Sequence, residues 1–196
     1  MLPPGGAELD IAILFADVRG STQLGERLAP TEYASLLNRF YKAATETLIR
    51  HDAVIDKLIG DEVMALFIPG FCGPNYIRRA AEAGLALFHA LGYRNAETPW
   101  MPIGAAVNSG KSYVGNVGSE GVVDFTALGD PVNTASRLAS SAGAGELLLS
   151  EEVFETVFEK IPSAETRTLN LRGKESPFPV RVLKPTSAAP TTEVSV

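Results

Sequence analysis

Cysteine is almost absent from this sequence of 196 residues, in which Cys72 is the only one. A single cysteine excludes an internal disulfide and any cysteine-rich zinc or iron–sulfur site. Long apolar runs are also missing: none approaches the roughly 20 residues that a helix needs to span a bilayer, so we expect no membrane partner. The opening segment, MLPPGGAELD, lacks the basic and apolar regions of a secretory signal, which makes the cytoplasm the expected compartment.

Positive charge is scarce as well. Lys and Arg together number 17, Asp and Glu number 23, and the formal net charge is −6. Proteins that bind nucleic acid usually present a basic face, and this sequence has no run of Lys or Arg, so we expect no nucleic-acid partner. A small nucleotide is not excluded. The 45% of apolar residues and 20% of charged residues are typical of a folded globular protein.

Composition divides the chain into one domain and two tails. Residues 1–8 are rich in Pro and Gly and are predicted to form a flexible arm. Residues 185–196 are rich in Pro, Ser and Thr with little apolar bulk, which predicts a disordered tail. Residues 9–184 contain no internal repeat and no linker, and we expect them to form a single domain.

Hydrophobic periodicity predicts alternating strands and helices in this domain. A helix is expected to open at Gly20–Thr22, and a longer one begins near Pro30 with Thr31 as its cap. Residues 69–74 are expected to form a loop, and Asp130 is expected to cap a later helix. Strands are expected over residues 11–15, 54–58, 63–67, 103–107, 111–117, 122–128, 147–149, 168–171 and 178–183. Further helices are expected over residues 77–91 and 131–141 and from residue 150 onward.

The first half of this order is β-α-β-β-α-β, which is the ferredoxin-like arrangement. The expected class is α+β, with helices on one face of a mainly antiparallel sheet. The later strands and helices are C-terminal additions to that core.

The segment FADVRGST, residues 15–22, combines features of a phosphate site. Asp17 stands at the end of a buried strand, and the Gly-Ser-Thr helix start that follows offers free backbone N–H groups and a positive dipole end. An acid beside a phosphate indicates Mg²⁺ bridging the two. The alternative is that Asp17 is a helix cap or a strand-end acid with a structural partner.

A second acid, Asp61, lies at the tip of the predicted hairpin, where Gly60 permits a tight turn. In a ferredoxin-like fold this tip lies beside the end of the first strand, so Asp17 and Asp61 are expected to meet. Two carboxylates at adjacent strand ends suit a pair of divalent metals. The alternative is ordinary turn chemistry, for which Asp next to Gly is common.

Asn133 and Arg137 are four residues apart on a predicted helix and therefore share one face. An amide suits a sugar hydroxyl, and a guanidinium suits a phosphate oxygen. The alternative is a solvated polar face with Arg137 in a surface ion pair.

Together these segments resemble the class III nucleotidyl cyclases, the catalytic domains of adenylyl and guanylyl cyclases, over about residues 9–184. The family motif F-x-D-(I/V)-x-G matches Phe15, Asp17, Val18 and Gly20. The motif K-x-x-G-D matches Lys57, Gly60 and Asp61. The motif G-D-x-V-N-x-A-(A/S)-R matches Gly129, Asp130, Val132, Asn133, Ala135, Ser136 and Arg137.

The resemblance implies a metal site. Asp17, Asp61 and the carbonyl of Val18 would bind two Mg²⁺ or Mn²⁺ ions per active site. One ion would activate the ribose 3′-hydroxyl, and the other would hold the triphosphate.

The resemblance also implies nucleotide contacts. Lys57 would recognise the base, Asn133 would orient the ribose, and Arg137 would stabilise charge on the five-coordinate α-phosphate. Arg172, in the segment Leu171–Lys174, would supply a cation to the triphosphate.

One position departs from many adenylyl cyclases, which carry a base-reading Asp seven residues before the helix asparagine. Here that position is Thr126, which resembles the Thr-bearing bacterial subclass, some of whose members are stimulated by bicarbonate. Bicarbonate is therefore a candidate effector. A Thr hydroxyl can accept from the adenine amino group, and guanylyl cyclases usually carry Glu where Lys57 stands. ATP is thus expected as the substrate in preference to GTP.

The resemblance finally implies a homodimer, because family sites form between two domains and this chain carries both sets of residues. The expected activity is that of an adenylate cyclase, which converts ATP to 3′,5′-cyclic AMP and pyrophosphate. The alternatives are a guanylate cyclase and a catalytically silent, cyclase-like module that binds nucleotide or dimerises. A diguanylate cyclase or polymerase-palm relative would also place acids on a ferredoxin-like sheet, but would lack the motif with Asn133 and Arg137.

Overall fold

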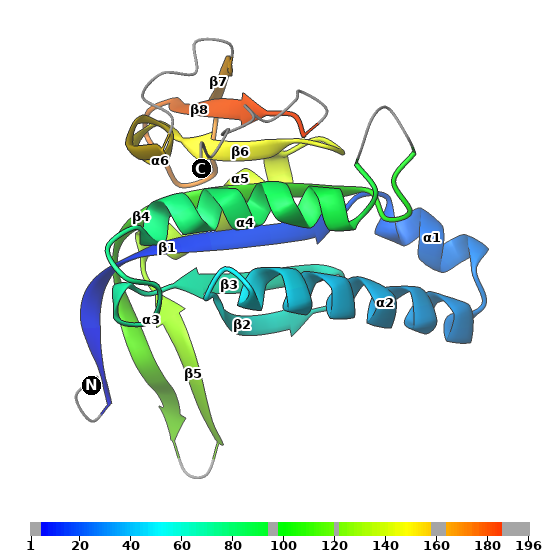
Figure 1. The fold of residues 1–196 in the computed structure, drawn as a ribbon, viewed down its shortest axis with the longest axis horizontal. Helices are drawn as coiled ribbons and strands as arrows, with labels where there is room; N and C mark the ends of the chain where they lie inside the picture. The colour runs from blue at the N-terminus through cyan, green and yellow to red at the C-terminus, as the bar shows by residue number, and fades with distance from the viewer. Residues whose placement is uncertain (1–4, 94–97, 120–121, 158–163, 186–196) are drawn as a thin grey trace, which may run out of the picture.

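The computed structural model describes residues 5–93, 98–119, 122–157 and 164–185 (Figure 1). Its strands are β1 (Gly6–Val18), β2 (Val54–Ile59), β3 (Glu62–Phe67), β4 (Ile103–Ser119), β5 (Val122–Leu128), β6 (Leu147–Ser150), β7 (Glu165–Leu169) and β8 (Phe178–Leu183). Its helices are α1 (Ser21–Arg27), α2 (Pro30–Ile49), α3 (Pro69–Cys72), α4 (Tyr76–Ala90), α5 (Asp130–Ser141) and α6 (Glu151–Val157).

The strands form one sheet in the order β2-β3-β1-β4-β6-β8-β7, and β5 pairs with β4 outside this path. Among the described strands, only β4 and β6 pair in parallel. The predicted α+β class is confirmed, because β1, α2, β2, β3, α4 and β4 follow the ferredoxin-like order. Strands β6, β8 and β7 extend this core as the expected C-terminal addition. No helix of the described residues is long and apolar enough to span a bilayer.

Both faces of the sheet are covered, which corrects the expectation of helices on one face. Alternate residues of β1, such as Leu14, pack with α2, α4 and α6, whereas the residues between them, such as Ile13, pack with α5 on the opposite face (Figure 1). The run from Ile11 to Ala16 is therefore buried throughout. Continuous apolar character is what a strand needs when both of its faces are covered.

The N-terminal half of β1 was not predicted. Gly6 pairs with Gly115 and the register continues unbroken to Val18 opposite Ile103, so β1 and β4 are both long strands. The predicted arm over residues 1–8 is wrong for residues 6–8, and residues 1–4 lie outside the described part. The two strands expected over residues 103–107 and 111–117 are one strand, because pairing with β1 continues through the polar residues between them. The predicted tail lies outside the described residues from 186 onward.

Three smaller expectations are also wrong. Helix α2 begins with Ala29 rather than Thr31 at its cap, and the Glu32 carboxylate accepts from the Ala29 N–H at 2.9 Å. The loop expected over residues 69–74 contains the short helix α3, which Pro69 starts. Strand β7 ends at Leu169 and lies earlier than expected, because it pairs with β8 from Glu165 onward.

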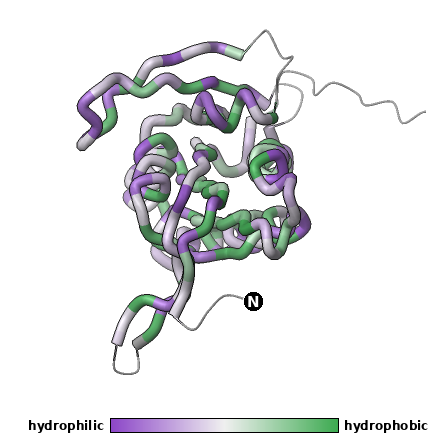
Figure 2. Tube along the Cα trace, turned by 90° about the vertical axis from the view of Figure 1, so that its left-hand side faces the viewer, coloured by the Kyte–Doolittle hydropathy of each residue, from purple (hydrophilic) through white to green (hydrophobic). Residues whose placement is uncertain are grey.

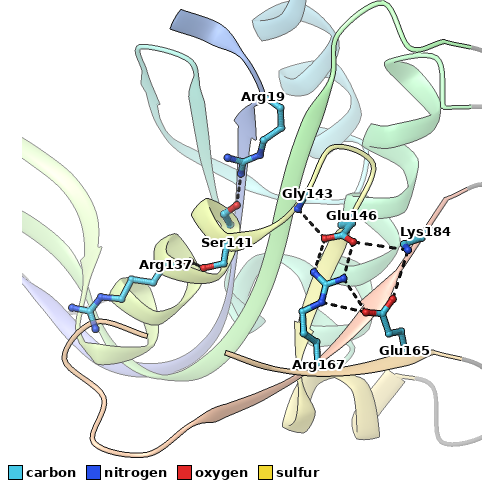
Figure 3. A network of polar contacts seen from close by, with 9 residues as sticks. Arg19, Arg137, Ser141, Gly143, Glu146, Glu165, Arg167 and Lys184 are labelled. Carbon is cyan, nitrogen blue, oxygen red and sulfur yellow. Dashed lines mark hydrogen bonds and ion pairs between the residues drawn. The ribbon is translucent and has the colours of Figure 1, made fainter. Parts of the chain in front are cut away.

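An ion-pair network joins the added strands to one another (Figure 3). Arg167 on β7 donates two parallel hydrogen bonds of 2.8 Å to Glu146, which stands just before β6. Arg167 also donates to Glu165 at 2.9 Å, and the Lys184 ammonium lies 3.6 Å from Glu165. The hydrogen bonds from Arg167 lower the pKa of Glu146 to about 2.

We expect this network to stabilise the fold in a pH-dependent way. The pKa of Glu146 is about 2 when folded and has a reference value of 4.5, so its contribution is present above pH 4.5 and is lost as pH falls towards 2. Replacing Glu146 by Gln should lower the free energy of unfolding at pH 7 by about 2 to 3 kcal/mol. Urea denaturation at pH 7 and pH 3 should show the difference from wild type shrinking by more than half. Glu165→Gln removes a more exposed partner and should change little; equal effects of both variants would contradict this assignment.

Candidate active site

The predicted meeting of the two acids rests on the packing of a turn against a strand end. Asp17 pairs across the sheet with Glu62, the first residue of β3. The turn before it contains Gly60 at φ 60°, a left-handed conformation that favours glycine. The Val18 N–H donates to the carbonyl of Asp61 at 3.1 Å, which fixes the hairpin tip at the end of β1.

Three carboxylates gather at this edge, of which Glu62 was not predicted. Burial raises the pKa of Asp17; Arg19 opposes this increase and the charge of Asp61 adds to it. Burial, followed by the charges of Asp17 and Asp61, raises the pKa of Glu62 to about 7. Carboxylates that repel one another in this way favour a bound cation.

The donor set at this end of β1 suits a divalent cation such as magnesium or manganese. Mg²⁺ in such sites takes one or two carboxylates and completes its ligands with substrate phosphates. Asp17 and Asp61 supply the carboxylates, and the Val18 carbonyl belongs to the same strand end. No group of three or more His, Cys, Asp or Glu side chains in the described ranges is arranged to hold a metal alone. Asp17 and Asp61 could therefore hold a divalent cation that takes its remaining ligands from outside the chain.

Arg19 is a further residue of this edge that sequence reasoning did not single out. Its Nη1 lies 3.2 Å from the Asp17 carboxylate. Its Nη2 donates to the carbonyl of Ala139 in α5, and this contact is drawn in Figure 3. The guanidinium thus joins the end of β1 to the helix that carries Asn133 and Arg137.

The two predicted base-reading residues are brought together by a third residue. Lys57 on β2 pairs with Asp124 on β5 and lies 3.6 Å from the Asp56 carboxylate. Thr126, two residues after Asp124, donates its hydroxyl proton to the same Asp56 oxygen at 2.9 Å. Asp56 was not predicted, because nothing in its sequence context distinguishes it from a solvated acid.

Helix α5 presents Asn133 and Arg137 away from the sheet, as their spacing predicts. Asn133 is exposed, whereas Thr134 and Leu138 are buried against the sheet. Figure 3 shows Arg137 extending away from Arg19. Arg19 contacts a backbone carbonyl in the last turn of α5, whereas the Arg137 side chain extends from the outer side of the helix.

The loop before β8 lies over the outer side of α5. A Cβ atom at Gly173 would lie 3.4 Å from Nη1 of Arg137, so this loop and the guanidinium are in close contact. Arg172 is exposed beside it. Lys174 pairs with Asp130 at 2.5 Å. Asp130 was expected to cap α5, but it is the first residue within the helix, and the cap position is occupied by Gly129.

Hydrogen bonds and ion pairs between the described residues divide the predicted site into separate groups. Asp17 pairs with Arg19, and Lys57 and Thr126 both contact Asp56. No such contact among the described residues joins Asp17 or Asp61 to Arg137.

Comparison with known proteins identifies a family. The family model described as the adenylate and guanylate cyclase catalytic domain matches residues 7–181. The uncharacterized protein Rv1319c of Mycobacterium tuberculosis is 34% identical over 178 residues, which cover 88% of this chain and 32% of that protein. Rv1318c from the same organism is 32% identical over 186 residues, covering 92% and 33% respectively. The chain thus spans about a third of the length of these curated relatives.

Two solved structures share the fold over nearly their whole length. The guanylyl cyclase Cya2 has a TM-score of 0.83 and 26% identity, with 96% of this chain and 98% of that chain covered. The adenylyl cyclase CyaB from P. aeruginosa has a TM-score of 0.77 and 28% identity, with 91% and 96% covered.

Proposed function

Because this chain belongs to the adenylate and guanylate cyclase catalytic domain family, we propose that it converts ATP to 3′,5′-cyclic AMP and pyrophosphate. The observation that carries the proposal is the meeting of Asp17 and Asp61 at the end of β1, where the charge of Asp61 adds to the increase in the pKa of Asp17 that burial causes. The decisive experiment is pyrophosphate release from MnATP, with the nucleotide product identified by chromatography. Absence of turnover would favour a silent module that only binds nucleotide or dimerises.

In the proposed reaction the ribose 3′-hydroxyl loses its proton to water, its oxygen bonds to the α-phosphorus, and the bond to the departing pyrophosphate breaks. Two divalent ions bound by Asp17, Asp61 and the Val18 carbonyl would make the 3′-hydroxyl more acidic and neutralise the triphosphate. Asn133 holds the ribose in position, and Arg137 donates to the α-phosphate as its charge grows.

Arg172 completes the proposed phosphate contacts. It is exposed in the loop that lies against Arg137, so its guanidinium can reach the triphosphate from the same side. Its neighbour Lys174 is paired with Asp130, which favours Arg172 over Lys174 for this role.

We also propose that two chains share each site. Arg137 points away from the Asp17–Arg19 pair of its own chain, so a nucleotide that contacts both Asp17 and Arg137 needs residues from two chains (Figure 3). The hairpin of β4 and β5 stands out from the body and carries hydrophobic residues (Figure 2). Five large apolar side chains on β2 and β5, the strands that carry Lys57 and Thr126, are exposed: Leu58, Ile59, Val123, Phe125 and Leu128. Such exposure suits contact with a second copy.

Base selection provides a direct prediction. Lys57→Glu should reduce kcat/KM for ATP by about 10- to 100-fold, because a carboxylate cannot donate to adenine and would face Asp56 and Asp124. Thr126→Asp keeps an acceptor for the adenine amino group, but it replaces the hydroxyl that donates to Asp56 by a second carboxylate, so kcat/KM for ATP should fall here as well. Product chromatography with ATP and GTP at equal concentration is the measurement. More cyclic GMP than cyclic AMP from the wild-type protein would contradict the proposed specificity. The bicarbonate response expected from Thr126 stays a prediction.

A further inference from the structure

Strand β2 contains an irregularity at Asp56. Ile55 pairs with Ala65 and Lys57 pairs with the adjacent residue Met64, so Asp56 is an extra residue in the ladder. Successive residues of a regular strand point to opposite faces, and a bulge re-aims the side chains around it. Here the bulge lets two consecutive residues, Asp56 and Lys57, both contact strand β5.

The Asp56 carboxyl group is buried with only part of its hydrogen-bonding capacity satisfied, which does not favour stability. Its side chain is 0% exposed. Oxygen Oδ2 accepts the Thr126 hydroxyl at 2.9 Å and lies 3.6 Å from the Lys57 ammonium. Oxygen Oδ1 is buried without a hydrogen-bond partner among the described residues. A buried, partly unsatisfied acid costs free energy, and such a group calls for a functional explanation.

The hydrogen bond to Asp56 changes what Thr126 can do. A free hydroxyl donates one hydrogen bond and accepts others, so it contacts a donor or an acceptor equally well. The Thr126 proton is committed to Asp56, which leaves only lone pairs for a ligand. Adenine presents an amino donor at its 6-position, whereas guanine presents a carbonyl acceptor there.

We propose that Asp56 is a positioning residue that selects adenine over guanine by holding the Thr126 hydroxyl as an acceptor. This inference rests on the proposed function of the site as a nucleotide cyclase. Lys57 balances the charge of the buried carboxylate and is held beside it by Asp124. A Thr126 hydroxyl without Asp56 could bind either base, so the discrimination comes from Asp56.

The test is the ratio of kcat/KM for ATP to kcat/KM for GTP in Asp56→Ala. Freed from Asp56, the Thr126 hydroxyl can donate to guanine, so the ratio should fall about tenfold. Asp56→Asn should give an intermediate fall, because an amide can accept from the hydroxyl or donate to it. The Asn variant also serves if the Ala variant does not fold.

Two further variants separate this role from a structural one. In a Thr126→Val background, Asp56→Ala should no longer alter the ratio, because there is no hydroxyl left to orient. Asp124→Asn is the matched control: its amide oxygen can still accept from Lys57, and it leaves the contact between Thr126 and Asp56 intact, so the ratio should stay within about twofold of wild type. An unchanged ratio in both Asp56 variants, or the same fall with and without the Thr126 hydroxyl, would overturn the proposal.

A binding measurement keeps this outcome distinct from failure of the proposed function. The 3′-deoxy forms of ATP and GTP lack the attacking hydroxyl, so their dissociation constants, measured by calorimetry with MnCl₂, report base selection without turnover. A wild-type protein that makes no cyclic nucleotide but prefers 3′-deoxy-ATP, and loses this preference in Asp56→Ala, would contradict the cyclase assignment and support Asp56. A protein that does make cyclic nucleotide, but whose binding preference is unaffected by Asp56→Ala, would support the cyclase assignment and contradict the role of Asp56.

Discussion

Alanine at Asp17 or at Asp61 should reduce nucleotide turnover by at least about 10³-fold while the protein stays folded. Both carboxylates lie with Glu62 at the end of β1, and turnover in the proposed reaction depends on the cations that they would hold. Removal of either acid relieves repulsion within the cluster, which for Asp17 offsets the loss of its ion pair with Arg19, so the apo protein should stay folded. Initial rates with MnATP and thermal melting would measure the two effects. Activity within tenfold of wild type for either variant would contradict the two-metal proposal.

Asp61→Ala is the cleaner of the two variants. Asp17→Ala leaves the Arg19 guanidinium without its carboxylate partner, whereas the carboxylate of Asp61 has no such contact among the described residues. Glu62 provides a readout that is independent of activity: its pKa, about 7 in the intact cluster, should fall when either acid is removed, although burial will keep it above its usual value. Addition of MnCl₂ with 3′-deoxy-ATP should raise the melting temperature of wild type and not that of the variants.

The arrangement of the acids could be predicted because it follows from topology. Once the chain order β-α-β-β-α-β is recognised, the hairpin between β2 and β3 must lie beside the end of β1. Asp17 is the second-last residue of β1 and Asp61 occupies the hairpin turn, so their proximity requires no knowledge of side-chain packing. The same holds for Asn133 and Arg137, whose common direction depends only on helical spacing.

The residues that were missed depend on register and on packing between distant elements. Asp56 reaches Thr126 only because of the bulge in β2, and one extra residue in a ladder leaves no mark in hydrophobic periodicity. Arg19 contacts Ala139, which lies 120 positions later in the chain. The partners of such side chains cannot be deduced from local sequence.

The covering of both sheet faces, by contrast, could have been predicted. Residues 11–16 of β1 are apolar without alternation, and this pattern favours a strand buried on both sides. A sheet with helices on one face would have shown polar residues at every second position. The apolar face of α5, which includes Leu138 and Ala135, packs against the face that the ferredoxin-like core leaves open.

A mixture of Asp17→Ala and Arg137→Ala chains should recover activity that neither variant has alone. In either homodimer both sites lack one essential group. In a heterodimer one site lacks both groups, but the other combines the intact Asp17 of one chain with the intact Arg137 of its partner. If the chains exchange freely, half of the dimers are mixed and half of their sites are complete, so activity should return to roughly a quarter of the wild-type value.

The physical basis of this recovery is the direction of Arg137. The Asp17–Arg19 pair contacts α5 through the Ala139 carbonyl in the last turn of the helix, whereas Arg137 extends away from Arg19 towards the loop at Gly173 (Figure 3). Co-expression of the two variants with different affinity tags, followed by sequential purification, would isolate mixed dimers, in which half of the wild-type activity is expected. Pairing Asp17→Ala with Asp61→Ala is the matched control. Each site takes both acids from a single chain, and each chain of this mixed dimer lacks one of them. Neither site then has both acids, and activity should remain absent. Mixed Asp17→Ala and Arg137→Ala chains that co-purify but remain inactive would show that each chain completes its own site.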